Sequence, residues 1–222
     1  MVRRRDGLET HEKILEVAGK LFAEKGYEKT THEEICKLAG VNIGAVNYHF
    51  QSKENLYREA WRHAFKKAIA KHPIDGGVAK DAPPEERLRG HLASFINRVA
   101  DPENLEIEIV FRDMANPSCL LEEAMMDSMG PIRKEMTSIL RELLGNEASE
   151  RDVQLCEMSI MGQCITPMVV KERQMQAPPP GFLHFTAEEK AEHIIKFSLA
   201  GVKEIKKSAA IGRTGKKKAQ GK

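Results

Sequence analysis

The chain has 222 residues, of which 41% are hydrophobic and 31% charged, a balance typical of a helix-rich globular protein rather than of a disordered one. No segment approaches the roughly 20 apolar residues of a membrane-spanning helix, and no secretory signal follows the basic N-terminus, so we expect a cytoplasmic protein. The net charge of +2 divides into +4 for residues 1–72, −9 for 73–202 and +7 for 203–222, which suggests nucleic-acid contact at one or both ends.

The N-terminal part is predicted to form short helices. Apolar residues at helical spacing indicate a first helix from about Thr10 to Lys25, with Gly26 as its stop. Thr31 and Glu34 form a capping-box pattern that begins a second helix, and Gly40 ends it.

A third short helix begins near Asn42, which can cap it, and Ser52 is expected to cap a longer helix over residues 53–71. The segment from Pro73 to Pro84 has the composition of a loop. Further helices are predicted at about 83–100, 104–115, 118–129, 131–144, 150–175 and 187–207, with the pair Gly130-Pro131 as one of the breaks.

The fold class is therefore all-α, with about nine helices and no credible strand. We expect an N-terminal domain over residues 1–57, a connecting helix over 53–71, and a larger helical domain over 72–207. Residues 176–181 form a stiff proline-rich loop, and residues 208–222 form a disordered basic tail that is either a solubilising tail or a DNA contact.

The predicted second and third helices are joined by the tight turn Ala39-Gly40-Val41-Asn42, which is the geometry of a helix-turn-helix. Glycine permits the positive φ that such a sharp turn needs. The core of this domain is expected to consist of Ile35, Leu38, Val41, Val46 and Phe50.

Residues 9–57 resemble the DNA-binding domain of the tetracycline-repressor (TetR/AcrR) family. The features at the spacings of that family are Ala39-Gly40-Val41, Gly44, Tyr48, Phe50 and Ser52-Lys53-Glu54. One departure is Asn47, which stands where many members have tyrosine and which can read adenine through two hydrogen bonds. The run from Ala45 to Phe50 resembles a subgroup with a C-terminal domain like that of the CecR/YbiH regulators.

The resemblance implies a set of residues that contact operator DNA. Thr31, Tyr48, His49 and Lys53 are the expected contacts to phosphate or sugar, with Lys53 as a phosphate clamp. The residues expected to face base edges are Asn42, Gly44, Ala45 and Asn47. Arg3, Arg4 and Arg5 are either an arm on the DNA or a solvated end.

The resemblance also implies a homodimer built from the last two long helices of each subunit. The expected interface residues are Leu155, Met158, Gly162, Ile165, Ile194, Phe197, Gly201, Val202 and Ile205. From the sequence alone, these apolar faces are buried either in a dimer or within the monomer.

The middle helices are rich in methionine, which adapts to varied hydrophobic ligands. By resemblance, they enclose a pocket for a small hydrophobic inducer, with Phe111, Arg112, Met129, Met161 and Gln163 as expected lining residues. Binding of the inducer would move the DNA-binding domains of the two subunits away from the spacing of about 34–36 Å between successive major grooves.

An enzyme is not expected, because the chain contains no phosphate-binding loop, dinucleotide fingerprint, nucleophile elbow or zinc helix motif. The four cysteines have no zinc-type spacing, and the pair Glu189 and His193 is typical of an ordinary surface contact, so no cofactor or metal is predicted. The function that the resemblance implies is a repressor that binds a palindromic operator as a dimer and is released by the small hydrophobic molecule. Two alternatives stay open, namely a DNA-binding regulator of the same fold without a sensor and an activator.

Overall fold

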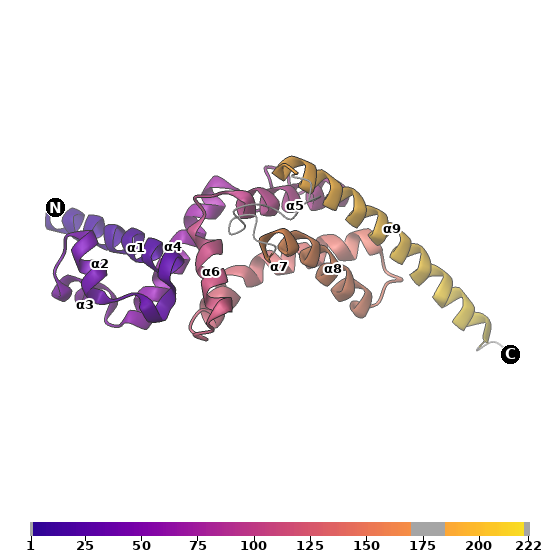
Figure 1. The fold of residues 1–222 in the computed structure, drawn as a ribbon. Coiled ribbons are helices and arrows are strands. Elements are labelled where there is room, and N and C mark those ends of the chain that lie inside the picture. The colour runs from indigo at the N-terminus through magenta and orange to yellow at the C-terminus, as the bar shows by residue number, and fades with distance from the viewer. Residues whose placement is uncertain (1, 170–184, 220–222) are drawn as a thin grey trace, which may run out of the picture. The chain divides into compact units, whose positions relative to one another are not determined.

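The computed structural model describes residues 2–169 and 185–219, and all regular elements in these ranges are helices, as the sequence predicted (Figure 1). They are α1 (Val2–Lys29), α2 (His32–Ala39), α3 (Ile43–Phe50), α4 (Lys53–Lys71), α5 (Pro84–Ala100), α6 (Leu105–Ala115), α7 (Glu122–Leu144), α8 (Glu150–Val169) and α9 (Ala187–Ala219). No helix among the described residues is long and apolar enough to span a membrane.

The helices form two compact units. The first comprises Met1–Lys71 and Asp101–Gly130, and the second comprises His72–Ala100 and Pro131–Lys222. The first unit is therefore built from two separate stretches of sequence, because α6 packs against α1 and α4, and Arg62 of α4 forms an ion pair with Asp127 of α7.

The first unit has an aromatic core. Phe22, Tyr57 and Trp61 are fully buried, and the ring of Trp61 stacks on Phe65 with centroids 5.3 Å apart. Helix α6 packs against α1 and α4. Its residue Asp113 accepts a hydrogen bond from the Tyr57 hydroxyl at 3.2 Å. These contacts join the N-terminal helices to a segment more than 30 residues farther along the chain.

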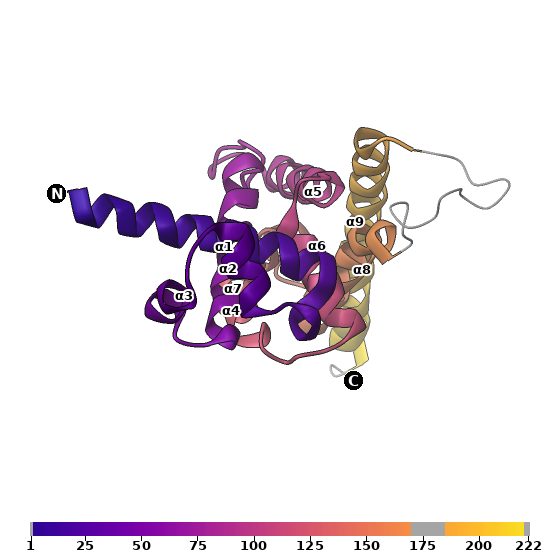
Figure 2. The same ribbon diagram turned by 60° about the vertical axis from the view of Figure 1, so that its left-hand side comes forward.

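The second unit contains α5, α8, α9 and the part of α7 that begins at Pro131. Its core joins Leu88 and Leu92 of α5 to Ile139 and Leu140 of α7 and to apolar residues of α8 and α9. Helix α9 packs against both α5 and α8. In Figure 2, α9 is drawn in orange to yellow beside α8.

The loop between α4 and α5 is fixed onto α5 by a backbone-to-backbone approach. A Cβ atom on Gly90 would collide with the carbonyl oxygen of Asp75 and the side chain of Val78, so only glycine fits there. The Ser94 hydroxyl also donates a hydrogen bond to the Pro73 carbonyl at 2.5 Å. Residues 72–83 are therefore a closely packed loop of the second unit.

Several element boundaries differ from the sequence predictions. Helix α1 begins at Val2 rather than near Thr10, and it is interrupted at the predicted stop, Gly26, where φ is 79° and ψ is 174°. Helix α7 continues through Pro131, where a break was expected. A proline removes one backbone donor, and the remaining hydrogen bonds of a helix can sustain it across that position.

The end of the chain also differs from its prediction. Helix α9 extends to Ala219, whereas residues 208–222 were expected to be disordered. Alanine and lysine, which are frequent in this segment, are good helix formers, and this propensity favours continuation of the helix. The predicted loop over 176–181 and the end of the preceding helix at 175 lie outside the described residues.

Candidate nucleic-acid interface

Helix α2 begins with the predicted capping box. The Thr31 hydroxyl accepts a hydrogen bond from the Glu34 N–H at 3.2 Å, and the Glu34 carboxylate accepts one from the Thr31 N–H at 3.4 Å. Lys25 of α1 forms an ion pair with the same carboxylate at 2.6 Å. Thr31, an expected phosphate contact, is thus the exposed N-cap of α2, and its N–H donates to Glu34.

The turn between α2 and α3 has the conformation that the sequence required. Gly40 adopts φ 63° and ψ 37°, in the left-handed region, and its N–H bonds the Cys36 carbonyl. Ile35, Val46 and Phe50 are buried as expected, and Val41 is half-buried. Leu38, however, is 61% exposed and does not belong to the core. It lies on the outer face of this short helix.

The N-terminus of α3 is shaped by its cap. The Asn42 side-chain oxygen accepts a hydrogen bond from the Ala45 N–H at 2.9 Å. A Cβ atom on Gly44 would lie 3.2 Å from that oxygen, so glycine leaves room for the cap. Asn42 is therefore a helix cap, and Ala45 is half-buried behind it.

The outward face of α3 carries the side chains predicted to read DNA. Asn47 is exposed, and Tyr48 is 81% exposed. A short, capped helix whose exposed face ends in an amide and a phenol has the form of a recognition helix. The structure therefore brings Asn42, Gly44, Asn47 and Tyr48 to one short element at the surface.

His49 lies at the end of α3 between two other rings. Its ring centroid is 5.4 Å from that of His11 on α1 and 5.2 Å from that of Tyr48. Partial burial and, to a lesser extent, electrostatic interaction with His11 lower the pKa of His49. The contact between His11 and His49 has no signal in the sequence, because the two residues are 38 positions apart and only the fold brings them together.

Helix α4 begins after a tight turn at Gln51, which has φ 64° and ψ −41° and whose neighbour Ser52 donates to the Phe50 carbonyl at 2.7 Å. A positive φ with a negative ψ and a hydrogen bond between residues i and i+2 is a γ-turn, which is rare and strained for a residue with a side chain. The Ser52 hydroxyl caps α4 by accepting from the Asn55 N–H at 3.1 Å, as predicted. The strained turn fixes the direction in which α4, and with it Lys53, leaves α3.

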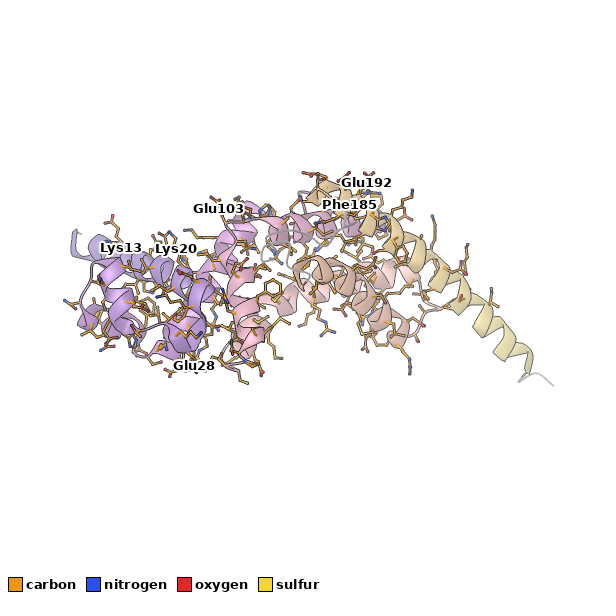
Figure 3. All side chains as sticks on the ribbon, in the orientation of Figure 1. Lys13, Lys20, Glu28, Glu103, Phe185 and Glu192 are labelled. Atoms are coloured by element: carbon orange, nitrogen blue, oxygen red, sulfur yellow. The ribbon has the colours of Figure 1, made fainter. Side chains whose placement is uncertain are left out.

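Lys53 is held by α1 rather than extended into solvent. Its ammonium nitrogen lies 4.3 Å from the centroid of the Tyr27 ring and donates to the Glu28 carbonyl at 3.4 Å. Figure 3 labels Glu28 at the end of α1. No sequence signal indicated Tyr27, because it precedes Lys53 by 26 positions and lies on another helix.

The residues predicted for the dimer interface fall into two groups. Leu155, Met158, Ile165, Phe197 and Ile205 are exposed, and a Cβ atom on Gly162 or Gly201 would meet nothing within 4 Å. Ile194 and Val202, in contrast, are buried in the core of their own unit. Helix α9 carries two apolar stripes, one facing inward and the other outward, and the sequence prediction did not separate them.

The predicted pocket residues are divided between the two units. Phe111, Arg112 and Met129 belong to the first unit, and Met161 and Gln163 belong to the second. The Arg112 guanidinium donates to the Ala23 carbonyl at the end of α1, at 3.1 Å. That contact gives Arg112 a structural role among the N-terminal helices.

Two family profiles match the chain in the order in which these elements occur. Residues 14–60 match the profile of bacterial regulatory proteins of the TetR family. Residues 84–202, more than half of the chain, match the C-terminal domain of the HTH-type transcriptional dual regulator CecR. The chain belongs to the TetR family. Its C-terminal domain is of the CecR type, as the sequence resemblance indicated, and the family consists of transcriptional regulators, not enzymes.

The chain is also similar to individual TetR-family regulators over part of its length. The chain is 41% identical over 58 residues to the regulator AcrR of Shigella flexneri, covering 26% of this chain and 27% of that one. It is 28% identical over 130 residues to the probable acrEF/envCD operon repressor of Escherichia coli strain K12, covering 56% and 58%. The chain thus matches from about a quarter to just over half of the length of these two relatives.

A solved structure matches the TetR-type fold over most of the chain. A mutant of the protein HlyIIR is similar with a TM-score of 0.60 and 26% identity, covering 86% of this chain and 95% of that one. The similarity therefore covers most of the length of both chains.

Proposed function

We propose that this protein binds a palindromic operator as a homodimer and represses transcription until a small hydrophobic molecule releases it. The observation that carries the proposal is the outward face of α3, where Asn47 and Tyr48 are exposed on a short capped helix. A helix of this kind fits the major groove and presents an amide that can pair with adenine.

The exposed apolar stripe on α8 and α9 supports the homodimer. Met158 is 64% exposed and Phe197 is 60% exposed, and a Cβ atom added to Gly162 or Gly201 would meet nothing within 4 Å. Apolar side chains at helical spacing beside glycines suit close helix-to-helix contact with a second copy. A dimer is needed because a single helix-turn-helix domain binds DNA weakly and with little specificity.

Release by a hydrophobic molecule is supported by the abundance of methionine in α6, α7 and α8, a side chain that repacks around varied apolar ligands. Repression is supported by the described role of the E. coli relative as an operon repressor. The matching C-terminal profile is named after a dual regulator, which favours activation as a second candidate function.

The test is binding of the purified protein to DNA fragments that flank its own gene, across a salt series and with a panel of hydrophobic compounds. We expect sequence-specific binding that Asn47→Ala weakens by about 1–3 kcal/mol, with relaxed specificity at one base pair. Lys53→Gln should weaken binding to all DNA sequences alike. It should also reduce the slope of log affinity against log salt concentration by about one per lost phosphate contact. Specific binding that no compound releases would favour the regulator without a sensor, and binding without sequence preference would refute the proposal.

We also expect the affinity for DNA to rise as the pH falls from 8 to 6. The lowered pKa of His49 leaves its imidazole mostly neutral at pH 7, and a nearby phosphate would favour the charged form. Proton uptake on binding then increases affinity by up to about tenfold per pH unit for each proton. His49→Gln should flatten this dependence, which fluorescence anisotropy with a labelled operator would measure.

The stability of the protein without DNA should instead decrease as the pH falls. Because the pKa of His49 is lower in the folded than in the unfolded chain, the contribution of this residue to stability is present at high pH. It is lost as the pH falls from the unfolded pKa of about 6.5 through the lower pKa of the folded protein. An affinity that is independent of pH in the wild type would contradict a DNA contact by His49.

A further inference from the structure

Tyr27 follows the interruption of α1 at Gly26, and its ring is fixed by two core residues. Its centroid lies 5.1 Å from that of Tyr57 and 6.4 Å from that of Phe22, and both of these side chains are fully buried. An aromatic ring packed in this way has a set orientation at the boundary between core and surface.

The face of this ring lies under the ammonium group of Lys53, at 4.3 Å from the centroid. The Glu28 carbonyl accepts a hydrogen bond from the same nitrogen at 3.4 Å. A lysine side chain has large rotamer freedom, part of which is lost when it makes a fixed contact. Two partners that hold the ammonium before DNA arrives reduce the entropy lost on binding.

The hydroxyl of Tyr27 contacts the residue next to Lys53. It donates a hydrogen bond to the Glu54 carboxylate at 3.0 Å. Hydrogen bonds from its own backbone N–H, from Ser52 and from Tyr27 lower the pKa of Glu54, so the carboxylate stays charged. Burial and the Glu54 charge raise the pKa of Tyr27 to about 12, so its hydroxyl stays protonated and remains a donor.

We propose that Tyr27 is a positioning residue for DNA binding, whose ring holds the Lys53 ammonium and whose hydroxyl holds the Glu54 carboxylate away from it. This proposal rests on the proposed function, in which Lys53 contacts a phosphate. Lys53 and Glu54 are consecutive on α4 and do not face each other along the helix, but a freed Glu54 carboxylate in this first turn would repel a phosphate bound at Lys53. One side chain thereby keeps a positive and a negative group apart at the start of α4.

The test separates the ring from the hydroxyl. Tyr27→Phe keeps the ring but frees Glu54, and it should weaken operator binding by about two- to fivefold per subunit, the effect expected for one exposed charge contact. Adding Glu54→Gln should restore the lost affinity. The matched control is Glu59→Gln, which removes a carboxylate from the same helix that is paired with Arg62 at 2.8 Å, and it should not restore affinity.

Tyr27→Leu removes both contacts and should weaken binding further than Tyr27→Phe, with a smaller salt slope. In a Lys53→Gln background the same change should have no additional effect on affinity. A second measurement needs no DNA: the Lys53 ε-methylene protons should show an upfield ring-current shift by NMR in the wild type and in Tyr27→Phe, but not in Tyr27→Leu. Circular dichroism would verify that each variant is folded.

The outcomes distinguish this proposal from the proposed function. A wild-type protein without sequence-specific DNA binding refutes the proposed function, whatever the NMR shift of Lys53. If the wild type binds and Lys53→Gln weakens it, while both Tyr27 variants bind like the wild type, the positioning role is refuted. Loss of affinity in Tyr27→Phe that Glu54→Gln leaves unrestored also refutes it.

Discussion

Replacing Phe197 with glutamate should convert the protein to a monomer and reduce its operator affinity by about a thousandfold, the minimum ratio between specific and non-specific binding for typical regulators. Phe197 is 60% exposed on α9, in the outward stripe that also contains Gly201 and Ile205. In the proposed dimer, this substitution would bury two carboxylates in an apolar interface without partners, which costs several kcal/mol.

Sedimentation velocity would measure the assembly state, and binding to an operator fragment would measure the affinity of the same samples. Met126→Glu is the matched control, because Met126 is 76% exposed on the first unit and lies outside the proposed interface. A wild-type protein that sediments as a monomer at micromolar concentration, or a Phe197→Glu variant that remains dimeric, would refute this interface.

Gly90→Ala should lower the free energy of unfolding by about 1–3 kcal/mol, the range for overpacked sites. The new methyl group would collide with the Asp75 carbonyl oxygen and with Val78, and the first of these is backbone that has little room to shift. The Ser94 hydroxyl holds the same loop at the Pro73 carbonyl. Urea denaturation followed by circular dichroism would measure the change.

Gly19→Ala is the control for this substitution. A Cβ atom on Gly19 of α1 would lie 3.6 Å from the Leu105 side chain, an ordinary van der Waals contact. Alanine in a helix interior is favoured over glycine by about 0.5–1 kcal/mol, so this variant should gain stability. Equal effects of the two substitutions would show that the loop does not pack tightly against α5.

The caps and the turn of the helix-turn-helix were predictable from the sequence, because each depends on neighbouring residues. The capping box at Thr31 and Glu34, the left-handed Gly40 and the caps at Asn42 and Ser52 depend only on residues a few positions apart, and the structure has all of them. The exposure of Leu38 was missed for the opposite reason. Spacing places a residue on a helix face, but only the neighbouring elements decide whether anything covers that face.

The contacts between distant segments were not predictable from patterns in one sequence. Ile194 and Phe197 are both apolar residues on α9, yet the first is buried in its own unit and the second is exposed. The hydrogen bond from Arg112, an expected pocket residue, to the Ala23 carbonyl joins residues 89 positions apart. The contact of Tyr27 with Lys53 likewise depends on how α1 meets α4.

The discontinuous first unit has a consequence for protein engineering. A chimera that grafts only residues 1–71 onto a different sensor would leave α6 behind, and with it the Asp113 partner of the buried Tyr57 hydroxyl and the Arg112 bond to α1. An unpaired buried hydroxyl costs about 1–3 kcal/mol. The DNA-binding unit that can be transferred is therefore the pair of segments 1–71 and 101–130. An exchange of DNA specificity between relatives should transfer both segments, or should replace only the surface residues of α3.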